Sequence, residues 1–439
     1  MSSGEEWSGV ETDGQVDMLA RGLNRREFLR VAIVAGGALL SGCGRRGDDV
    51  PGARVTLTQW YHQYGEKGTQ EAVLRYAAAY TRSHPDVAVR VVWVPGDYHT
   101  KLATALLTSG GPDIFETSLT VPMVSADQVV GLDDLFPPAI RRDFLQRDLD
   151  ANSVGGKIYG VKMVDDTGIL YYRPSLLKAA RLKPPQTMDE LISSARKLQT
   201  RERKGLFVGN DGGISALTTL MPWSAGSDFL QGDKILFNNA RTALSYEKLR
   251  ELSDSGALLI GATTDWWDPS VFNQGQAAMQ WSGMWAFPAI RKALGDDVGG
   301  MAWPALDHDR ASRPVTFLGG WSQMINSRSP HIEEAKKFVR WLWIDNLQLQ
   351  QDWNLSYGFH VPPRLSVAKN ATPLRAAVPS LALKNVQKHG RFTPPAWNSA
   401  MGTALGDAIT NIVKNGSPAM AQIEAAAFKC ERELKRLLQ

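Results

Sequence analysis

The segment from residue 55 to residue 115 alternates between strand and helix patterns, and this alternation restricts the chain to few folds. Apolar residues at every second position predict strands over residues 55–60 and 87–91. Apolar residues at helical spacing predict helices over 69–83 and 98–109, and a third strand begins at residue 113. The order strand-helix-strand-helix-strand implies a parallel sheet with right-handed crossovers. The fold class predicted is therefore α/β.

The rest of the chain continues this pattern less regularly. The residues predict a hairpin turn over 156–160, a strand over 168–172, and helices over 335–343 and 419–438. A further helix begins after Thr187, whose side chain caps it. A chain of 439 residues predicts two domains, at about 100–200 residues per domain.

The charge and the missing motifs exclude several classes of function. The net charge of +4 includes an arginine-rich leader, so the body is nearly neutral and nothing favours nucleic acid as a partner. Nucleotide-binding loops, the serine hydrolase elbow and the zinc protease motif are absent from the sequence. Seven histidines are scattered, and His360 and His389 have no partner at metal spacing. We expect no cofactor, no metal and no enzyme activity.

The leader carries the signals of export. Arg25 and Arg26 form a twin-arginine pair, and the apolar run over residues 31–40 is ten residues long. Such a run rises about 15 Å as a helix, half of a hydrocarbon core of about 30 Å, so it predicts a signal peptide and not a stable span. Residues 40–43, Leu-Ser-Gly-Cys, resemble the bacterial lipobox, in which Cys43 is acylated.

The leader therefore predicts a signal peptide of the twin-arginine type over residues 1–42 and a polar linker over 43–53. The first seventeen residues are acidic, which is unusual at the start of a signal peptide, so translation beginning at Met18 is an alternative to Met1. If Cys43 carries lipid, Cys430 is left alone and cannot form an intramolecular disulfide.

The chain has fourteen tryptophans, and seven of them stand where the sequence favours a loop or the end of a strand. A tryptophan at the end of a strand is either part of the core or a flat apolar wall for a ligand, and the sequence leaves both readings open. The tryptophans in such positions are Trp60, Trp223, Trp266, Trp267, Trp285, Trp321 and Trp397.

Five stretches together resemble one family, the extracytoplasmic solute-binding proteins of ABC importers that bind sugars. They occur in the family's order: Gly-Gly-Pro-Asp over 110–113; a Gly-Lys-x-Tyr-Gly block with Leu-Tyr-Tyr and Met-Asp-Glu-Leu over 156–191; Phe-x-x-Gly-x-Ala-Ala-Met with Gly-x-Trp over 272–285; Gly-Gly-Trp into a helix over 319–335; and a Gly-x-x-Pro-x-Arg turn over 358–364. Lys162 stands where the family usually has proline, and Arg173-Pro174 replaces Asn-Lys.

The resemblance implies a two-lobed periplasmic-binding-protein-like fold of type II, in which hinged parallel-sheet lobes close over a ligand cleft. The expected lobe 1 covers residues 54–164 and 312–350, and the expected lobe 2 covers 165–311 and 351–439. The implied function is a substrate-binding lipoprotein that captures a neutral or amino sugar, or an oligosaccharide, and delivers it to a membrane permease with a cytoplasmic ATPase. We expect a monomer anchored by lipid on the extracytoplasmic face of the cell membrane.

The expected cleft combines aromatic rings, which stack on sugars, with carboxylates, which accept hydroxyl hydrogens. Ligands of open parallel sheets bind at the carboxyl ends of strands, where this sequence has His62, Tyr64, Glu116, Asp165 and Asp166. The resemblance implies that Trp285 is a stacking residue, that Trp223 precedes a cleft loop and that Asp166 is a ligand-binding acid. The backbone N–H of Gly320 is expected to add a further donor. The flanking tryptophans Trp321 and Trp397 complete the predicted ligand-binding set.

Two other functions remain open from the sequence. Related family members carry glycerophosphodiesters or glycerol phosphate, and such a ligand would need a cation, for which Arg364 or Arg391 could serve. An exported glycan-cleaving enzyme is less favoured, because Asp165 and Asp166 are adjacent and not opposed across a sugar.

Overall fold

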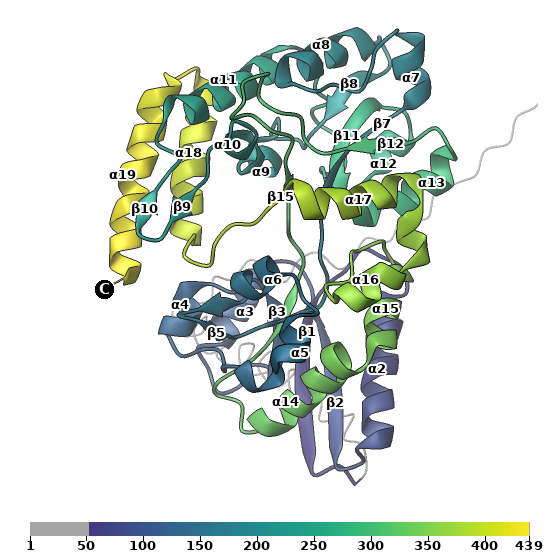
Figure 1. The fold of residues 1–439 in the computed structure, drawn as a ribbon, viewed down its shortest axis with the longest axis vertical. Coiled ribbons are helices and arrows are strands. Elements are labelled where there is room, and N and C mark those ends of the chain that lie inside the picture. The colour runs from purple at the N-terminus through teal and green to yellow at the C-terminus, as the bar shows by residue number, and fades with distance from the viewer. Residues whose placement is uncertain (1–51, 439) are drawn as a thin grey trace, which may run out of the picture. The chain divides into compact units, whose positions relative to one another are not determined.

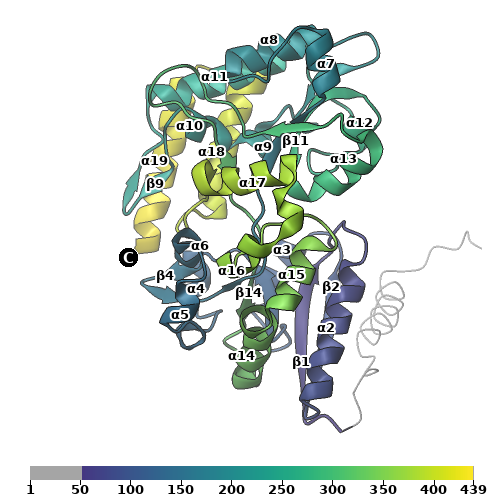
Figure 2. The same cartoon turned by 45° about the vertical axis from the view of Figure 1, so that its right-hand side comes forward.

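A computed structural model of the protein describes residues 52–438. The predicted signal peptide, the lipobox with Cys43 and most of the linker lie outside the described residues. Residues 52–438 contain two main sheets, each with its own core and its own helices (Figures 1 and 2). The two-lobed α/β fold expected from the sequence is thus confirmed, and we call the parts around these sheets the first and second lobes.

The first lobe is built on a five-stranded sheet in the order β2-β1-β3-β14-β6. Strand β1 pairs in parallel with β2 and β3, as the alternating pattern predicts, whereas β14 runs antiparallel to β3 and β6. Its elements are β1 (Val55–His62), α2 (Thr69–Ser83), β2 (Val87–Val94), α3 (Tyr98–Ala105), β3 (Ile114–Thr117), α4 (Val121–Ser125), α5 (Pro138–Arg141), α6 (Gln146–Ala151), β4 (Ser153–Val154), β5 (Lys157–Ile158), β6 (Val161–Lys162), β14 (Ser322–Ile325) and α14 (Ile332–Arg340).

The second lobe is built on a four-stranded sheet in the order β12-β7-β11-β8. This sheet is mixed, because only β11 and β8 run in parallel. Its elements are β7 (Gly168–Tyr172), α7 (Pro174–Ala179), α8 (Met188–Leu198), β8 (Lys204–Phe207), α9 (Ile214–Leu217), α10 (Leu220–Ser224), β9 (Leu230–Gln231), β10 (Lys234–Ile235), α11 (Ala240–Asp254), α12 (Ser270–Asn273), β11 (Ala277–Gly283), α13 (Phe287–Leu294), β12 (Gly299–Met301), β13 (Thr316–Phe317), β15 (Gly390–Arg391), α18 (Ser399–Asn415) and α19 (Ala419–Leu438).

Three segments connect the lobes and lie side by side. Residues 163–167 run from β6 to β7, and residues 318–321 run from β13 to β14. The third segment contains α15 (Leu347–Leu355), α16 (Leu365–Asn370) and α17 (Ala377–Lys388). Asp165 pairs with Val361 and Thr167 pairs with Leu318 through single backbone bridges. These bridges hold the crossing segments together at the point where the lobes meet.

Several local predictions are confirmed at residue level. Helix α8 begins after Thr187, whose hydroxyl accepts the backbone N–H of Glu190 and so satisfies a free donor at the helix start. The apolar face predicted over residues 335–343 is fully buried in the core of the first lobe, although the helix widens into a π turn after Arg340. The predicted hairpin turn at 156–160 lies slightly earlier, between β4 and β5.

Two elements lie across the lobe boundaries that the sequence suggested. Helix α15 runs through residue 350, and its Trp353 packs in the core of the first lobe. Strand β13 pairs with β15, which follows α17. Trp353 of α15 lies beyond the expected boundary at residue 350 but packs in the core of the first lobe. Phe317 of β13 lies in the expected lobe 1 but packs against the core of the second lobe. The lobe boundaries stay predictions.

Candidate functional site

A cavity of about 910 Å³ opens at the carboxyl end of β1 and is lined by both lobes. This volume is within the usual range for small-ligand sites. We call it the aromatic cavity. Its rings belong to His62, Tyr64, Trp267, Trp285, Trp321 and Tyr357, and its charged side chains are Glu66, Lys67, Asp166, Asp268 and His360.

Glu116 organises the wall of this cavity on the first lobe. Its carboxylate accepts the backbone N–H of His62 at 2.8 Å, and its other oxygen accepts the Tyr64 hydroxyl at 2.7 Å. The His62 ring lies 2.5 Å from the same carboxylate. Burial, and then the charge of Glu116, raise the pKa of Tyr64, so its hydroxyl stays a donor. Glu116 is fully buried, and it therefore positions the two rings without reaching a ligand itself.

Trp321 is held in place by two imidazole rings. Its ring stacks with His62 at a centroid distance of 4.1 Å and with His99 at 5.5 Å. Part of its ring surface is thus already packed against protein. Trp321 lines the cavity as a partly covered wall and offers less free ring surface than the sequence suggested.

Trp285 and Trp267 form the opposite wall on the second lobe. The indole N–H of Trp285 donates to the backbone oxygen of Trp267 at 3.0 Å. The Trp285 ring lies directly on Gly283, where an added Cβ would meet ring atoms at 1.9–2.2 Å. This contact explains the Gly-x-Trp motif, because only glycine lets the ring lie flat against the backbone. Trp267 is 54% exposed at the cavity.

His360 joins two carboxylates at the cavity floor. Its Nδ1 bonds to Asp166, and its Nε2 lies 3.4 Å from Glu66. Burial alone would lower the pKa of His360, but the two carboxylates outweigh burial and raise it to about 10. The ring is therefore an imidazolium at neutral pH. It links the loop after β1, a crossing segment and the loop after α15.

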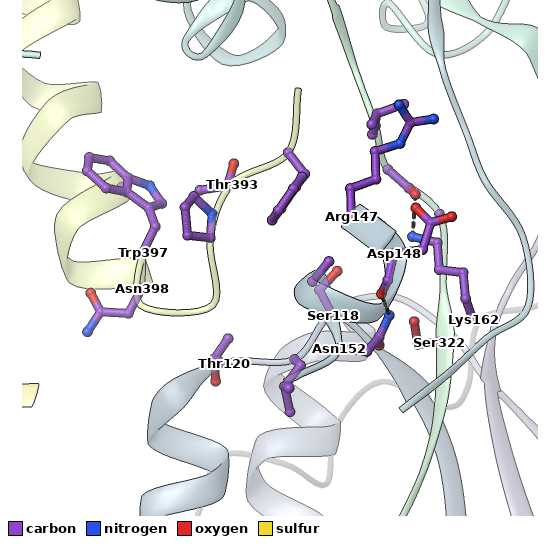
Figure 3. A pocket seen from close by; sticks show the side chains of 18 of the residues that line it. Ser118, Thr120, Arg147, Asp148, Asn152, Lys162, Ser322, Thr393, Trp397 and Asn398 are labelled. Carbon is purple, nitrogen blue, oxygen red and sulfur yellow. Dashed lines mark hydrogen bonds between the residues drawn. The ribbon is translucent and has the colours of Figure 1, made fainter. Parts of the chain in front are cut away.

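A second cavity of about 400 Å³ is lined by hydroxyl and amide side chains from both lobes. We call it the hydroxyl cavity. Figure 3 shows Trp397 and Asn398 on one side of it and Arg147 and Lys162 on the other. The Trp397 ring packs edge to face on Phe229 and Phe237 of the second core. The remaining labelled side chains are Ser118, Thr120, Asp148, Asn152, Ser322 and Thr393.

Lys162 ties the crossing segments together beside this cavity. Its ammonium donates to the backbone oxygen of Gly319 at 2.6 Å and lies 3.6 Å from Asp165. Burial, and then Asp148, raise the pKa of Asp165 well above its usual range. Lys162, which stands where the family usually has proline, thus contacts two crossing segments and lines the hydroxyl cavity. It does not line the aromatic cavity.

The structure brings together half of the predicted ligand-binding residues in the aromatic cavity. These are His62, Tyr64, Asp166, Trp285 and Trp321. Gly320 and Trp397 line the hydroxyl cavity instead, and Glu116 lies behind the aromatic wall. Asp165 is buried against Lys162. Trp223 is only 1% exposed in the second core and packs on Phe229, so it offers no face to a ligand.

Sequence reasoning missed five of the charged and aromatic residues that line the cavity, namely Glu66, Lys67, Asp268, Tyr357 and His360. Glu66 and Tyr357 lie on loops, and Asp268 follows Trp267 in another loop. His360 has no partner at metal spacing in the sequence, and the structure shows that it is buried and lines the cavity. Its partner Asp166 is 194 residues away in sequence, so no local pattern could reveal the pair.

The two arginines that the sequence suggested for a phosphate lie outside the aromatic cavity. Arg364 is buried and committed to Asp143 and to the backbone oxygen of Ile344, so it cannot serve a phosphate in the cavity. Arg391 lines neither cavity. Within residues 52–438, no group of three or more metal-type side chains could hold an ion. No helix in this range is both long enough and apolar enough to cross a membrane.

Comparison with known protein families gives one match that covers most of the chain. The model of the bacterial extracellular solute-binding proteins matches residues 66–342. A probable ABC transporter-binding protein of Deinococcus radiodurans is 26% identical over 343 residues, which is 74% of this chain and 80% of that protein. An arabinooligosaccharide-binding protein of Bacillus subtilis is 22% identical over 316 residues, covering 69% of this chain and 72% of that protein.

Solved structures share the fold. A solute-binding protein of an ABC transporter from Thermotoga lettingae, bound with α-D-tagatose, has a TM-score of 0.73 at 20% identity and covers 86% of this chain and 99% of its own. UgpB from Mycobacterium tuberculosis, in complex with glycerophosphocholine, has a TM-score of 0.71 at 18% identity and covers 88% of this chain and 99% of its own. These likenesses support the fold described above.

Proposed function

Because the chain belongs to the bacterial extracellular solute-binding proteins, we propose that it is the substrate-binding lipoprotein of an ABC importer and that it captures a carbohydrate. The family works with ABC permease components and binds small molecules. The observation that carries the carbohydrate proposal is the aromatic cavity, which combines indole rings and carboxylates in the lining of one space of about 910 Å³. Indoles stack on sugar rings, and carboxylates accept hydroxyl hydrogens.

The ligand-binding residues of this proposal are those that the cavity gathers. Trp285 stacks on a sugar ring, with Trp267 beside it at the rim. Asp166 and Glu66 accept hydroxyl hydrogens on the other side. His62 and Tyr64 are fixed by Glu116 and line the same space with their rings.

The proposed protein binds its ligand and does not cleave it. Glycoside cleavage needs two opposed carboxyl groups with separate acid and base roles. Here Asp166 and Glu66 share one imidazolium from His360, so neither is free to act as the general acid. The curated relatives are binding proteins, which supports the same view.

A thermal-shift screen against mono- and oligosaccharides tests this function. A ligand at 100 times its Kd adds about 2.7 kcal/mol to the free energy of unfolding, which raises Tm measurably. We expect at least one sugar to raise Tm in proportion to its concentration. If no sugar does so while the protein is folded, the carbohydrate proposal is wrong.

A second candidate ligand is a glycerophosphodiester. It is favoured by the structural likeness to a protein in complex with glycerophosphocholine. Lys67 and His360 are the cations that line the cavity, and the arginines suggested by sequence do not. Glycerophosphocholine and glycerol phosphate therefore belong in the same screen.

The location of the protein in the cell is also part of the proposal. We propose that Cys43 is acylated after export by the twin-arginine route, and that the mature protein is a monomer held by its lipid on the extracytoplasmic face of the cell membrane. The support is the order of the arginine pair, the apolar run and the lipobox in the sequence.

A further inference from the structure

The aromatic cavity carries an excess of negative charge. Three carboxylates line it from three separate segments: Glu66 after β1, Asp166 in a crossing segment and Asp268 before α12. Two cationic side chains line it, His360 and Lys67. The imidazolium is shared by Glu66 and Asp166, so it balances only one of them.

The charged groups Lys67, Asp268 and Glu116 differ in how far they change this excess. Lys67 is exposed at the rim and can turn toward water. Asp268 accepts the backbone N–H of Ser270 at 2.8 Å through one oxygen, and no cation in residues 52–438 forms an ion pair with it. Glu116 lies directly behind His62 and Tyr64 and adds a further buried carboxylate to the same side.

The walls beside these carboxylates are aromatic faces. Trp267 is half exposed and directly precedes Asp268 in the chain. The indole N–H of Trp285 donates to the backbone oxygen of Trp267 at 3.0 Å, which fixes the two indoles beside each other. A cation over an indole face gains roughly 0.5–2 kcal/mol. Carboxylates and indoles at one place thus favour a positive group for two independent reasons.

We infer that the ligand of the aromatic cavity carries a cationic nitrogen beside its hydroxyl groups, held between Asp268 and the indoles of Trp267 and Trp285. This inference rests on the proposed function and narrows its ligand. Two sources share the chemistry, an amino sugar and a choline-bearing glycerophosphodiester. In both, the hydroxyl groups reach Asp166 and Glu66 while the cationic nitrogen lies beside Asp268.

Titration calorimetry with matched probes tests the inference at a pH where the amine is protonated. The first pair is a β-1,4-linked glucosamine disaccharide and its N-acetylated form, with cellobiose as a further neutral sugar. The second pair is glycerophosphocholine and glycerol phosphate. We expect the cationic member of one pair to bind at least about tenfold more tightly than its partner. The pair that responds identifies the source.

Variants that remove one carboxylate charge show which residue causes the preference for a cationic probe. Asp268→Asn keeps the shape of the side chain and removes its charge, so it should weaken the cationic probe about tenfold and a neutral sugar by less than about threefold. Glu71→Gln, on the exposed first turn of α2, removes a carboxylate outside the cavity and should change neither. Circular dichroism and Tm confirm that each variant is folded.

The outcomes separate this inference from the proposed function. If a neutral sugar binds and neither cationic probe binds more tightly than its partner, the inference is overturned and a carbohydrate-binding protein is left. Unchanged affinity of Asp268→Asn for the cationic probe also overturns it. If no sugar binds and only the choline compound does, the inference stands and the carbohydrate proposal fails. If none of the probes binds, both fail.

Discussion

His360 is the residue that most changes the chemistry of the site, because it holds two carboxylates together in a buried place. Without it, Asp166 and Glu66 would repel each other at the cavity floor. The contacts of His360 with Asp166 and Glu66 also link three segments that are far apart in sequence. His360 therefore fixes the positions of the groups that face the ligand.

Stability should depend on pH through this residue. The pKa of His360 is about 10 in the folded protein against 6.5 for an ordinary histidine, so folding favours the protonated form. Its stabilisation is complete below about pH 6.5 and is lost as pH rises toward 10. We expect the free energy of unfolding to fall over that window, and to fall less in His360→Gln. Urea titrations of both proteins at several pH values measure this, and parallel curves would contradict it.

Trp285 should carry much of the binding energy. Truncating a central aromatic anchor costs 2 kcal/mol or more in typical interfaces, about thirtyfold in affinity. We expect that loss for Trp285→Ala with little change in Tm. Phe428→Ala removes an exposed ring on α19 and serves as the control. Calorimetry on both variants decides, and equal affinities would show that the cleft lies elsewhere.

Single residues were predictable where a motif fixes their surroundings. Trp285 follows Gly283 in a short motif, and the structure shows the ring lying on that glycine. Trp223 has no such neighbour, and it lies in the core. His360 and Glu66 gain their role only from contacts across the fold, which no window of sequence contains.

At the scale of elements, the crossing segments matter most, because they connect the lobes and border both cavities. Gly320 lies in one of them with a φ of 90°, which favours glycine. A Cβ at this position would meet the backbone oxygen of Val164 at 2.0 Å in the neighbouring segment. The two segments can approach this closely only because residue 320 has no side chain.

Replacing this glycine should therefore destabilise the protein. We expect Gly320→Ala to lower the free energy of unfolding by at least about 1 kcal/mol, because both the φ and the contact are incompatible with a side chain. The matched control is Gly406→Ala in helix α18, where no heavy atom lies within 4 Å of the added Cβ. That change should be neutral or stabilising by up to about 1 kcal/mol. Urea midpoints of the two variants test this, and a stable Gly320→Ala would refute the close approach.

Regular elements with strong periodicity were predicted well. Helix α2 spans residues 69–83 and α19 spans 419–438, as their apolar spacing indicates. The second sheet was harder, because strands β7 and β11 are buried on both faces and pair in an order that local pattern does not encode. The position of β14 beside β3 depends on a chain return of more than 200 residues.

At the scale of the whole molecule, the proposed location of the protein depends on the predicted leader over residues 1–42. Replacing Cys43 with Ala should release the protein from the membrane fraction, because the acceptor of the lipid is lost. Replacing Arg25 and Arg26 together with Lys should leave precursor in the cytoplasm if export uses the twin-arginine route. Fractionation and immunoblotting measure both, with the wild type and Cys430→Ser as controls.

These two changes give separable results. Normal export of the double lysine variant would contradict the twin-arginine route and leave the lipobox prediction intact. Membrane retention of Cys43→Ala would contradict lipidation at that residue.

The central claim is that the aromatic cavity captures a carbohydrate and returns it unchanged. Titration calorimetry of the purified protein with a panel of sugars and oligosaccharides, followed by mass spectrometry of the same samples, tests it most directly. We predict saturable binding of one ligand per protein, with the sugar recovered intact. Absence of binding by every sugar, or the appearance of cleavage products with turnover, would contradict the account.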